Sequence, residues 1–569
     1  MNKTFLLVVL LPLSAWLLRA ETIPGLGTAT FPTSTHSAAA QSEFMRGLLL
    51  LHLFEYPDAA KSFVAAERTD PGFAMAYWGE AMTFNHGVWN EVDVSAGQTA
   101  LAKFGATPEE RSRRIADPRE RAYMSAVEIL YCGKSDKHER DAQYATAMEQ
   151  LAVAYPKDDE AQLFYALALL GKSEGVRDVP TYLKAAEIAK IVFARNPDHP
   201  GAAHYWIHGM DDPQHAAGAL EAARALSKIA PDAGHAQHMC SHIFMALGMW
   251  DEVVQANVAA MSVVNRQRAA AGKHPGHCGH YNYWLEYGYL EQGRFGEAEK
   301  VVAGCRAEAA EAGMAARARG TVDPDNASVS SFAVMRNRYI IDTGRWNGEV
   351  AGWSVDLGGA QMPEFSYVFG TGFAAAELGD VAAARKSLAS LGQLLAQLPA
   401  LFDHEGLSAD DPDRRVPEIQ KAQIEAVTLS AEGHGDQALA ILQQAVASGK
   451  DLPYAFGPPY PGNPSEELLG ELLLKANKAP QAREAFAASL KRAPRRAESL
   501  LGLARAESAM GDKAAAANSY SELLRIWKNA DPGYAPKDEA RRYVSSTSAG
   551  NGQTEKRRLE PRLWSRDRA

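Results

Sequence analysis

The feature that most constrains the fold is a pattern of small, aromatic and proline residues that occurs near both ends of the chain. After Gly47, the residues Ala59, Phe63, Ala66 and Pro71 follow at offsets of 12, 16, 19 and 24. The same offsets recur near the C-terminus, at Gly470, Ala482, Phe486, Ser489 and Pro494. Small residues at fixed places let two helices approach closely, and a proline favours the first turn of the next helix. The pattern therefore predicts helix pairs that repeat about every 34 residues.

This spacing resembles the tetratricopeptide repeat (TPR). The resemblance implies an all-α fold, a TPR-type α-solenoid of antiparallel helix pairs that forms a right-handed superhelix. A generic helical bundle is the alternative, but it does not require one spacing at both ends of the chain. In the middle, Pro197 and Pro231 are also separated by one repeat length, which indicates that the array continues there.

Between the clear repeats, helix pairs with weaker patterns alternate with insertions. Insertions are expected at Val88–Asp117, Gly272–Gly279 and Lys450–Pro464, of which the first is polar and the last is rich in proline. The predicted organisation is a signal peptide at 1–20, N-terminal helical pairs at 36–195, central repeats with a His-rich groove at 196–345, degenerate helical pairs at 346–449, a Pro-rich loop at 450–464, C-terminal repeats at 465–530 and a disordered basic tail at 541–569.

The N-terminus has the character of an export signal. Lys3 gives a basic start, Phe5–Leu18 is apolar but interrupted by Pro12, and Ala20 is a small residue suited to cleavage before Glu21. This stretch is short for a stable membrane span and favours a cleaved signal peptide over an uncleaved anchor. We therefore expect a periplasmic or secreted protein without a membrane span after cleavage.

Longer segments resemble a group of large exported bacterial TPR proteins with which no established reaction is associated. These segments are FAMAYWGEAMTFNHGVW at 73–89, HPGAAHYWIHGMDDPQHA, AGHAQHMCSHIFMALG and AFGPPYPGNPSEELLGELLL. The likeness runs from about Gln41 to Asp531 and implies the fold and the exported location. Resemblance to TPR proteins in general implies a protein or peptide bound in the concave groove, and a small-molecule ligand is an alternative. The net charge of −10 argues against nucleic acid as the main partner.

Six histidines fall at predicted groove positions of three successive helix pairs. They are His204, His208, His235, His238, His242 and His280. His204 and His238 are one repeat length apart, as are His208 and His242, so each couple occupies equivalent positions in neighbouring repeats. Alignment across the insertion makes His280 equivalent to His235, and it places Tyr283 and Tyr287 on the same groove as ligand-binding candidates.

Histidines in this arrangement can bind a transition metal. Residues four apart share one helix face, and packed helices lie about 8–10 Å apart, a gap that two imidazoles can span. Zn, Cu, Fe, Ni or Mn is the expected ion. Asp211 and Asp212 can supply a carboxylate ligand or a hydrogen-bond partner behind a ligand. Two alternatives remain: a metal-free groove that binds a peptide or ligand, and histidines copied by repeat duplication with a structural role only.

A second pair, His52 and His86, is also separated by one repeat length and is a possible second site, although no third ligand is evident. No catalytic residue can be named. The segment from His204 to His208 lacks the glutamate of an HExxH protease motif, so that chemistry is not supported. The two function classes that remain are a binding module with a His-lined groove and a metal-dependent enzyme.

Two further features are left open by the sequence. The pairing of the four cysteines, Cys132, Cys240, Cys278 and Cys305, is not predicted, although an exported protein can form disulfides. Cys240 is expected to be buried between the helices of its pair. The aromatic, Pro-rich run from Tyr454 to Pro461 either folds back to line the groove or serves as a spacer between two repeat blocks.

Overall fold

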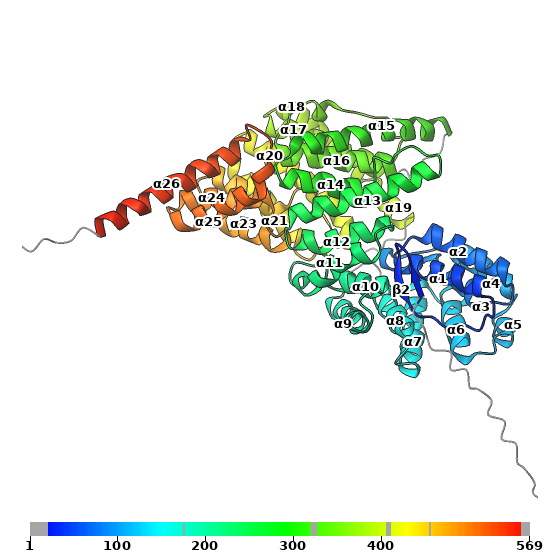
Figure 1. Cartoon of the computed structure of the whole chain (residues 1–569). Helices are drawn as coiled ribbons and strands as arrows, with labels where there is room; N and C mark the ends of the chain where they lie inside the picture. Colours follow the sequence, from blue (N-terminus) through cyan, green and yellow to red (C-terminus); the bar gives the residue numbers. More distant parts are fainter. Residues whose placement is uncertain (1–20, 174–176, 320–326, 405–410, 455–456, 559–569) are drawn as a thin grey trace, which may run out of the picture. The chain divides into compact units, whose positions relative to one another are not determined.

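The computed structural model describes residues 21–173, 177–319, 327–404, 411–454 and 457–558. These residues form 26 α-helices, five short 3-10 helices and four short strands (Figure 1). The signal peptide predicted at 1–20 lies outside the described residues. Among the described residues, no helix has both the length and the apolar character that crossing a membrane requires. The chain divides into two compact units, and each is described by itself.

Unit 1 comprises Met1–Gly175 and Leu183–Tyr205. Two small antiparallel strand pairs accompany its helices. Its elements are β1 (Glu21–Ile23), β2 (Gly27–Ala29), α1 (Ala38–His52), α2 (Tyr56–Thr69), α3 (Ala74–Met82), β3 (Asn85–His86), η1 (Gly87–Trp89), β4 (Glu91–Val92), α4 (Val94–Phe104), α5 (Pro108–Arg114), α6 (Pro118–Cys132), α7 (Lys137–Ala154) and α8 (Asp159–Gly171). Two helices, α9 (Val179–Arg195) and α10 (Pro200–Met210), contribute residues to both units.

Unit 2 comprises Val176–Tyr182 and Trp206–Ala569. Each of its helices packs mainly on the neighbours that precede and follow it in sequence, as expected for a solenoid. Its further elements are η2 (Ala216–Ala219), α11 (Leu220–Ile229), α12 (Gly234–Ala246), α13 (Trp250–Ala270), α14 (His280–Glu291), α15 (Phe295–Arg319), α16 (Ala327–Thr343), η3 (Val350–Gly352), α17 (Gln361–Glu377), α18 (Val381–Leu395), α19 (Leu398–His404), η4 (Pro412–Arg415), α20 (Val416–Ala431), α21 (Gly435–Gly449), α22 (Ser465–Lys475), α23 (Ala479–Arg492), α24 (Ala497–Ala509), α25 (Lys513–Ile526), η5 (Trp527–Asn529) and α26 (Ala535–Arg558).

The repeat packing confirms the fold predicted from spacing. The ring of Phe63 fills the space beside Gly47 and Gly79, where a Cβ atom would lie 2.8 and 2.3 Å from the ring. Phe486 does the same beside Gly470 and Gly502, with distances of 2.7 and 2.2 Å. Because both aromatic residues rest on glycines at the same offsets, the two distant helix pairs are built alike. The chain is an all-α solenoid of the TPR type.

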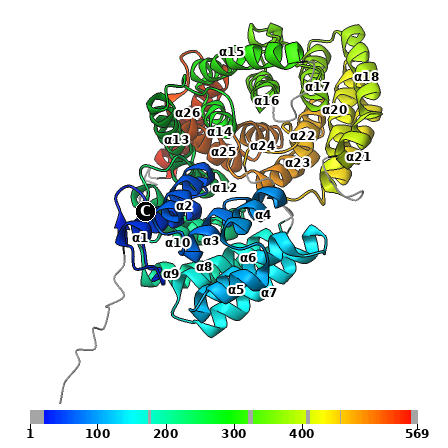
Figure 2. The ribbon, with the colours of Figure 1, turned by 90° about the vertical axis from the view of Figure 1, so that its right-hand side faces the viewer.

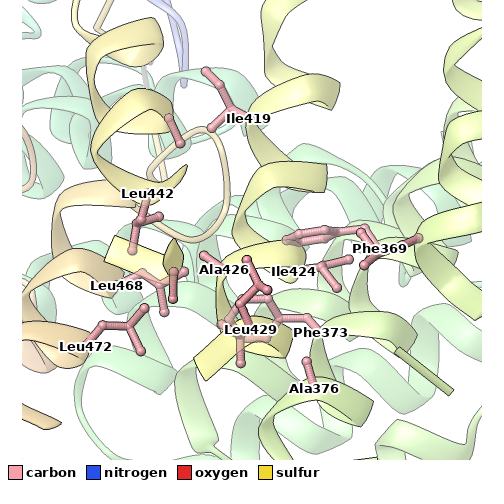
Figure 3. Packing of buried hydrophobic residues seen from close by; sticks show 14 of the residues in the cluster. Phe369, Phe373, Ala376, Ile419, Ile424, Ala426, Leu429, Leu442, Leu468 and Leu472 are labelled. Atoms are coloured by element: carbon pink, nitrogen blue, oxygen red, sulfur yellow. The ribbon is translucent and has the colours of Figure 1, made fainter. Parts of the chain in front are cut away.

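Between the outer repeats of unit 2, apolar faces build one continuous core. Phe369 and Phe373 of α17, Ile424 of α20 and Leu442 of α21 are all buried in one cluster with Leu468 of α22 (Figure 3). These side chains recur at helical spacing and turn one face of each helix towards its neighbours. The helices of the region predicted as degenerate helical pairs, 346–449, therefore pack around a shared apolar core.

The helix array of unit 2 closes on itself. The backbone of Gly248, at the end of α12, accepts a hydrogen bond of 2.8 Å from Arg495, and Trp250 donates to the carbonyl of Arg495 at 3.1 Å. Further along, Trp527 donates to the carbonyl of Glu291 at 3.2 Å. Figure 2 shows α14 next to α24 and α25. Helices from the beginning and the end of this unit are thus direct neighbours, although they are far apart in the sequence.

A buried guanidinium joins these helices. Arg496 is 1% exposed and contacts Glu467 through two hydrogen bonds of 2.8 Å, Asp342 at 2.7 Å and Glu291 at 3.1 Å. Burial raises the pKa of Glu291 to about 7, although Arg496 acts in the opposite direction. Three acidic side chains from α14, α16 and α22 therefore converge on one cation at the start of α24.

Two segments differ from the sequence-based expectation. The predicted insertion Val88–Asp117 contains α4 and α5; Asp93 caps α4 by accepting from Ala96 N at 2.9 Å, and the apolar Leu101 and Phe104 are buried. The tail expected to be disordered from Arg541 instead continues α26 through Arg558. Its first turns are held because Tyr543 packs on Tyr520 with ring centroids 4.8 Å apart.

Substitution of Arg496 by alanine should destabilise unit 2 by about 3–5 kcal/mol, because three carboxyl groups stay buried without their cation. The loss should be smaller at pH 5 than at pH 8, since buried acids with raised pKa values take up protons as the pH falls. Urea unfolding followed by circular dichroism measures both effects. Arg505→Ala is the control: its ion pair with Glu539 is largely exposed, so it should cost less than about 1 kcal/mol. Equal losses for the two variants would contradict the structural role of Arg496.

Candidate metal centre

Three of the predicted histidines come together in unit 2. His238 and His242 lie one turn apart on α12, and His280 is the first residue of α14. One ring nitrogen from each of the three lies within 4.8 Å of the other two. His238 and His242 are buried, whereas His280 is exposed. This trio, named here the histidine trio, could surround one metal ion with a small inward movement of the rings, since metal–nitrogen bonds are about 2.0–2.1 Å long.

The hydrogen bonds of Asn257 fix the orientation and tautomer of His238. Asn257 donates its amide N–H to the carbonyl of Val253 at 2.8 Å, so its side-chain oxygen faces Nδ1 of His238 at 2.7 Å. Because that oxygen can only accept, Nδ1 carries the proton and Nε2 carries the lone pair. Nε2 is buried and has no hydrogen-bond partner. A buried nitrogen lone pair without a partner is costly in a metal-free core and suited to a metal ion.

Asp211 performs the same task for His242. Nδ1 of His242 lies 3.0 Å from Oδ2 of Asp211, and Arg177 donates to the other carboxylate oxygen at 2.6 Å. The aspartate is buried, and the arginine supplies its counter-charge. The carboxylate therefore accepts the Nδ1 proton of His242 and leaves Nε2 as the nitrogen able to bind a metal.

Trp284 forms one wall of the trio. Its ring lies 4.5 Å from the ring of His242, 4.7 Å from that of His238 and 5.2 Å from that of His280. Burial, together with the neighbouring histidines, holds the pKa of His238 well below its ordinary value. The pKa of His280 is also lowered, by burial of its imidazole and by His242. Both rings are therefore neutral at pH 7, and the neutral imidazole is the form that binds metals.

The other three predicted groove histidines lie outside the trio. The ring of His208 is 5.9 Å from that of His242, and its Nδ1 is 4.0 Å from Asp211. The ring of His235 is 6.2 Å from that of His238. His204 belongs to unit 1, where its Nδ1 donates to the carbonyl of His52 at 2.7 Å. Equivalent repeat positions thus do not give His204 the surroundings of His238.

Three other predicted residues have partners away from the trio. Asp212 accepts from Arg177 at 2.7 Å and also contacts His215. The hydroxyl of Tyr283 accepts from Arg338 at 3.3 Å, and that of Tyr287 lies 3.5 Å from Arg496. Asp211 is therefore the one predicted carboxylate that supports the trio. Its role is to hydrogen-bond the ring of His242 and not to bind the metal itself.

The pair predicted as a second site does not form one. His52 contacts Glu160 at 2.6 Å, and His199 contacts the other oxygen of the same carboxylate at 2.9 Å. His86 lies elsewhere in unit 1, stacked on Tyr56 with ring centroids 4.0 Å apart. His52, Glu160 and His199 are completely buried. Each of them also offers an atom that can bind a metal, a ring nitrogen or a carboxylate oxygen, and these atoms lie close together.

This second group differs from the trio in one decisive respect. Its ring nitrogens already point at a carboxylate and donate to it, and Nδ1 of His199 has no partner that could hold a proton if Nε2 bound a metal. Metal-binding histidines normally donate their other ring N–H to an acceptor. We therefore interpret the His52–Glu160–His199 group as a buried hydrogen-bond network.

Several residues of both groups were not predicted. Asn257 is a single polar residue on the buried face of α13, and Arg177 lies far in sequence from the histidines that it supports. Only the presence of a polar residue at a core position could have pointed to Asn257. Trp284 is four residues after His280 on the helix expected there, so helical spacing alone could have placed it beside the trio.

The Pro-rich loop folds back into unit 2. Arg338 of α16 donates to the carbonyls of Pro459, at 2.8 Å, and Gly462. Gly457 lies against Trp284, where a Cβ atom would come within 2.7 Å of the indole. These contacts favour the first of the two interpretations of this segment. A small cavity of about 60 Å³ is lined by the loop, Trp250 and Tyr287.

The cysteines form one disulfide within the described residues, between Cys278 and Cys305. Cys132 and Cys240 are free, and Cys240 is buried as expected. The disulfide joins the segment just before α14, which begins at His280, to α15.

No protein-family model and no curated protein matches this sequence. Among solved structures, the chain is similar to the APC/C hetero-tetramer Cut9–Hcn1, with 12% identity, 89% of this chain and 76% of that chain covered, and a TM-score of 0.33. It is also similar to Tom70 of yeast, with 12% identity, 90% of this chain and 96% of that chain covered, and a TM-score of 0.27. At such TM-scores, neither similarity carries an argument about function.

Replacement of Glu160 by glutamine should destabilise unit 1 without changing the metal content. Burial alone would raise the pKa of Glu160, but His52 and His199 outweigh it and hold that pKa below the ordinary 4.5. A lowered carboxyl pKa contributes stability above pH 4.5 that is lost as the pH falls towards the folded-state value. The difference in unfolding free energy between wild type and Glu160→Gln should therefore be largest near pH 7 and shrink below pH 4.5. A metal content that falls with this substitution would show that the group is a metal site.

Proposed function

We propose that this protein is an exported metal-binding TPR protein, which holds one transition-metal ion through Nε2 of His238, Nε2 of His242 and a ring nitrogen of His280. The observation that carries the proposal is the hydrogen bonding behind the ligands. Asn257 accepts the Nδ1 proton of His238, and Asp211 accepts that of His242. The Nε2 lone pairs of the two rings therefore face the same space. Such partners behind the ligands are typical of metal sites and orient the rings before the ion binds.

The chemistry of the donors narrows the choice of ion. Three neutral imidazoles suit Zn²⁺, Cu²⁺, Fe²⁺ or Ni²⁺, whereas Mn²⁺ prefers oxygen ligands. The only carboxylate of the described residues that contacts a ring of the trio is Asp211, and its oxygens are already engaged by His242 and Arg177. Mn²⁺ is therefore the least suitable of the ions expected from the sequence.

The exported location is part of this proposal. The apolar N-terminal segment supports it, and so does the disulfide between Cys278 and Cys305, since disulfides persist in oxidising compartments. The repeat fold further supports a protein or peptide partner, since solenoids of this kind use extended concave surfaces for binding.

Metal analysis of the mature protein, purified without a His tag and supplied with Zn²⁺, tests the proposal. We expect about one equivalent in the wild type and none in His238→Ala. Asp211→Asn and Asn257→Leu should weaken zinc binding by about 10–100-fold, because the rings lose their orienting partners. His434→Ala removes an exposed histidine of the same unit and should retain the full equivalent. Absence of bound metal in the wild type after supply of zinc, copper, iron and nickel would end the proposal.

A metal-dependent enzyme is the second candidate, favoured by the exposure of His280. Three protein ligands leave a fourth coordination position of a tetrahedral ion for water or a substrate, as in catalytic zinc sites. In the cobalt-substituted protein, added azide should therefore change the visible absorption bands of Co²⁺. An unchanged spectrum at saturating azide would identify a closed, structural site and exclude this candidate.

A further inference from the structure

We propose that the disulfide between Cys278 and Cys305 controls the metal affinity of the histidine trio by holding His280 in place, and that a dithiol reductant weakens metal binding by opening it. This inference rests on the proposed function, because it concerns the regulation of the same site. It starts from a difference among the three ligands. His238 and His242 lie in the middle of α12, whereas His280 begins α14.

The start of a helix is its least constrained part, because the first backbone N–H groups lack partners inside the helix. The cap residue Gly279 makes no side-chain hydrogen bond to α14. Its φ angle of 97° lies in the left-handed region that favours glycine, a conformation that other residues rarely adopt. The position of His280 therefore depends on how firmly the residues before it are attached.

Those residues are attached to α15 at two points. The disulfide brings the Cα atoms of Cys278 and Cys305 within 4.6 Å of each other. One turn further along α15, Glu308 accepts hydrogen bonds from the backbone N–H groups of His277, at 2.7 Å, and Cys278, at 3.3 Å. Ser328 of α16 donates to the other oxygen of Glu308 at 2.9 Å. The disulfide is the covalent one of these attachments, and it is separated from His280 by Gly279 alone.

The two sulfur atoms differ in accessibility. Cys305 is completely buried, whereas Cys278 is only half-buried. A thiolate of the reductant can therefore attack the sulfur of Cys278, which breaks the S–S bond and releases Cys305 as a thiolate that takes up a proton. The second thiol of the reductant then attacks the mixed disulfide and releases Cys278. Overall, two electrons and two protons pass from the dithiol to the disulfide, and the dithiol becomes a disulfide itself.

Opening the disulfide leaves only hydrogen bonds to hold this segment: those to Glu308 of α15, and one of 3.1 Å from the N–H of Gly279 to Ser331 of α16. Glu308 lies in a half-exposed region, so water competes with its carboxylate for the same N–H groups. His280 then loses part of its orientation before the metal binds, and affinity falls accordingly. The two ligands on α12 are unaffected, so the expected result is weaker binding rather than complete loss.

The test is a double-mutant cycle on the full-length mature protein, with Zn²⁺ affinity measured by competition with a chromophoric chelator. Cys278→Ser combined with Cys305→Ser should weaken zinc binding by about tenfold, the lower end of what loss of an orienting partner costs. The same pair of substitutions in a His280→Ala background should have no further effect. Cys132→Ser, which removes a free cysteine of unit 1, is the matched control and should bind zinc as the wild type does.

Either of two results with the variants would overturn the inference. One is an unchanged zinc affinity in the double serine variant. The other is a loss of affinity in the His280→Ala background equal to that in the wild-type background, which would show a general structural effect. To separate affinity from misfolding, the wild type is reduced with a phosphine and then reoxidised. Zinc affinity should fall and return, and an affinity that does not fall also overturns the inference. A wild type with an intact disulfide that binds no zinc would instead refute the proposed function.

Discussion

Unit 2 depends on one buried guanidinium. Packing between successive helix pairs fixes only neighbouring repeats, so it does not determine whether an array stays open or closes. Arg496 joins the two ends of the array, because it binds Glu291 and Asp342, which lie far before it in the sequence, together with Glu467. The planar, five-donor guanidinium suits several carboxylates at once. Removing these charges from water is unfavourable, and a mismatched closure would leave a buried acid unpaired at a much higher cost in free energy. The network therefore favours one specific closure.

The sequence predicted the fold because the determining contacts are local and periodic. Gly47, Phe63 and Gly79 sit at fixed offsets, and the same offsets return at Phe486. Closure could not be predicted, since nothing near Arg496 in sequence indicates which distant acids it meets. The helices α4 and α5 were missed because their few buried residues, such as Leu101 and Phe104, are scattered among polar ones. The spacing of residues thus predicts the repeat architecture, but it does not predict which side chains from distant repeats contact each other.

The candidate site shows the same division. The repeat register predicted one surface for six histidines and treated His204 as equivalent to His238, whereas the trio consists of His238, His242 and His280. The Nδ1 atom of His204 has an acceptor, the carbonyl of His52, as that of His238 has Asn257, but His204 belongs to unit 1. In the His52–Glu160–His199 network, by contrast, the Nε2 atoms of both rings already face the carboxylate of Glu160. The capacity of a histidine to bind a metal depends on which nitrogen is left with a lone pair, and tertiary structure alone decides that.

The Pro-rich loop has a consequence for recognition by partners. Since it already lies against Trp284, Arg338 and Arg492, a peptide that bound to these residues would first have to displace it. The apparent dissociation constant of such a peptide would equal its intrinsic value divided by the fraction of molecules in which the loop has withdrawn.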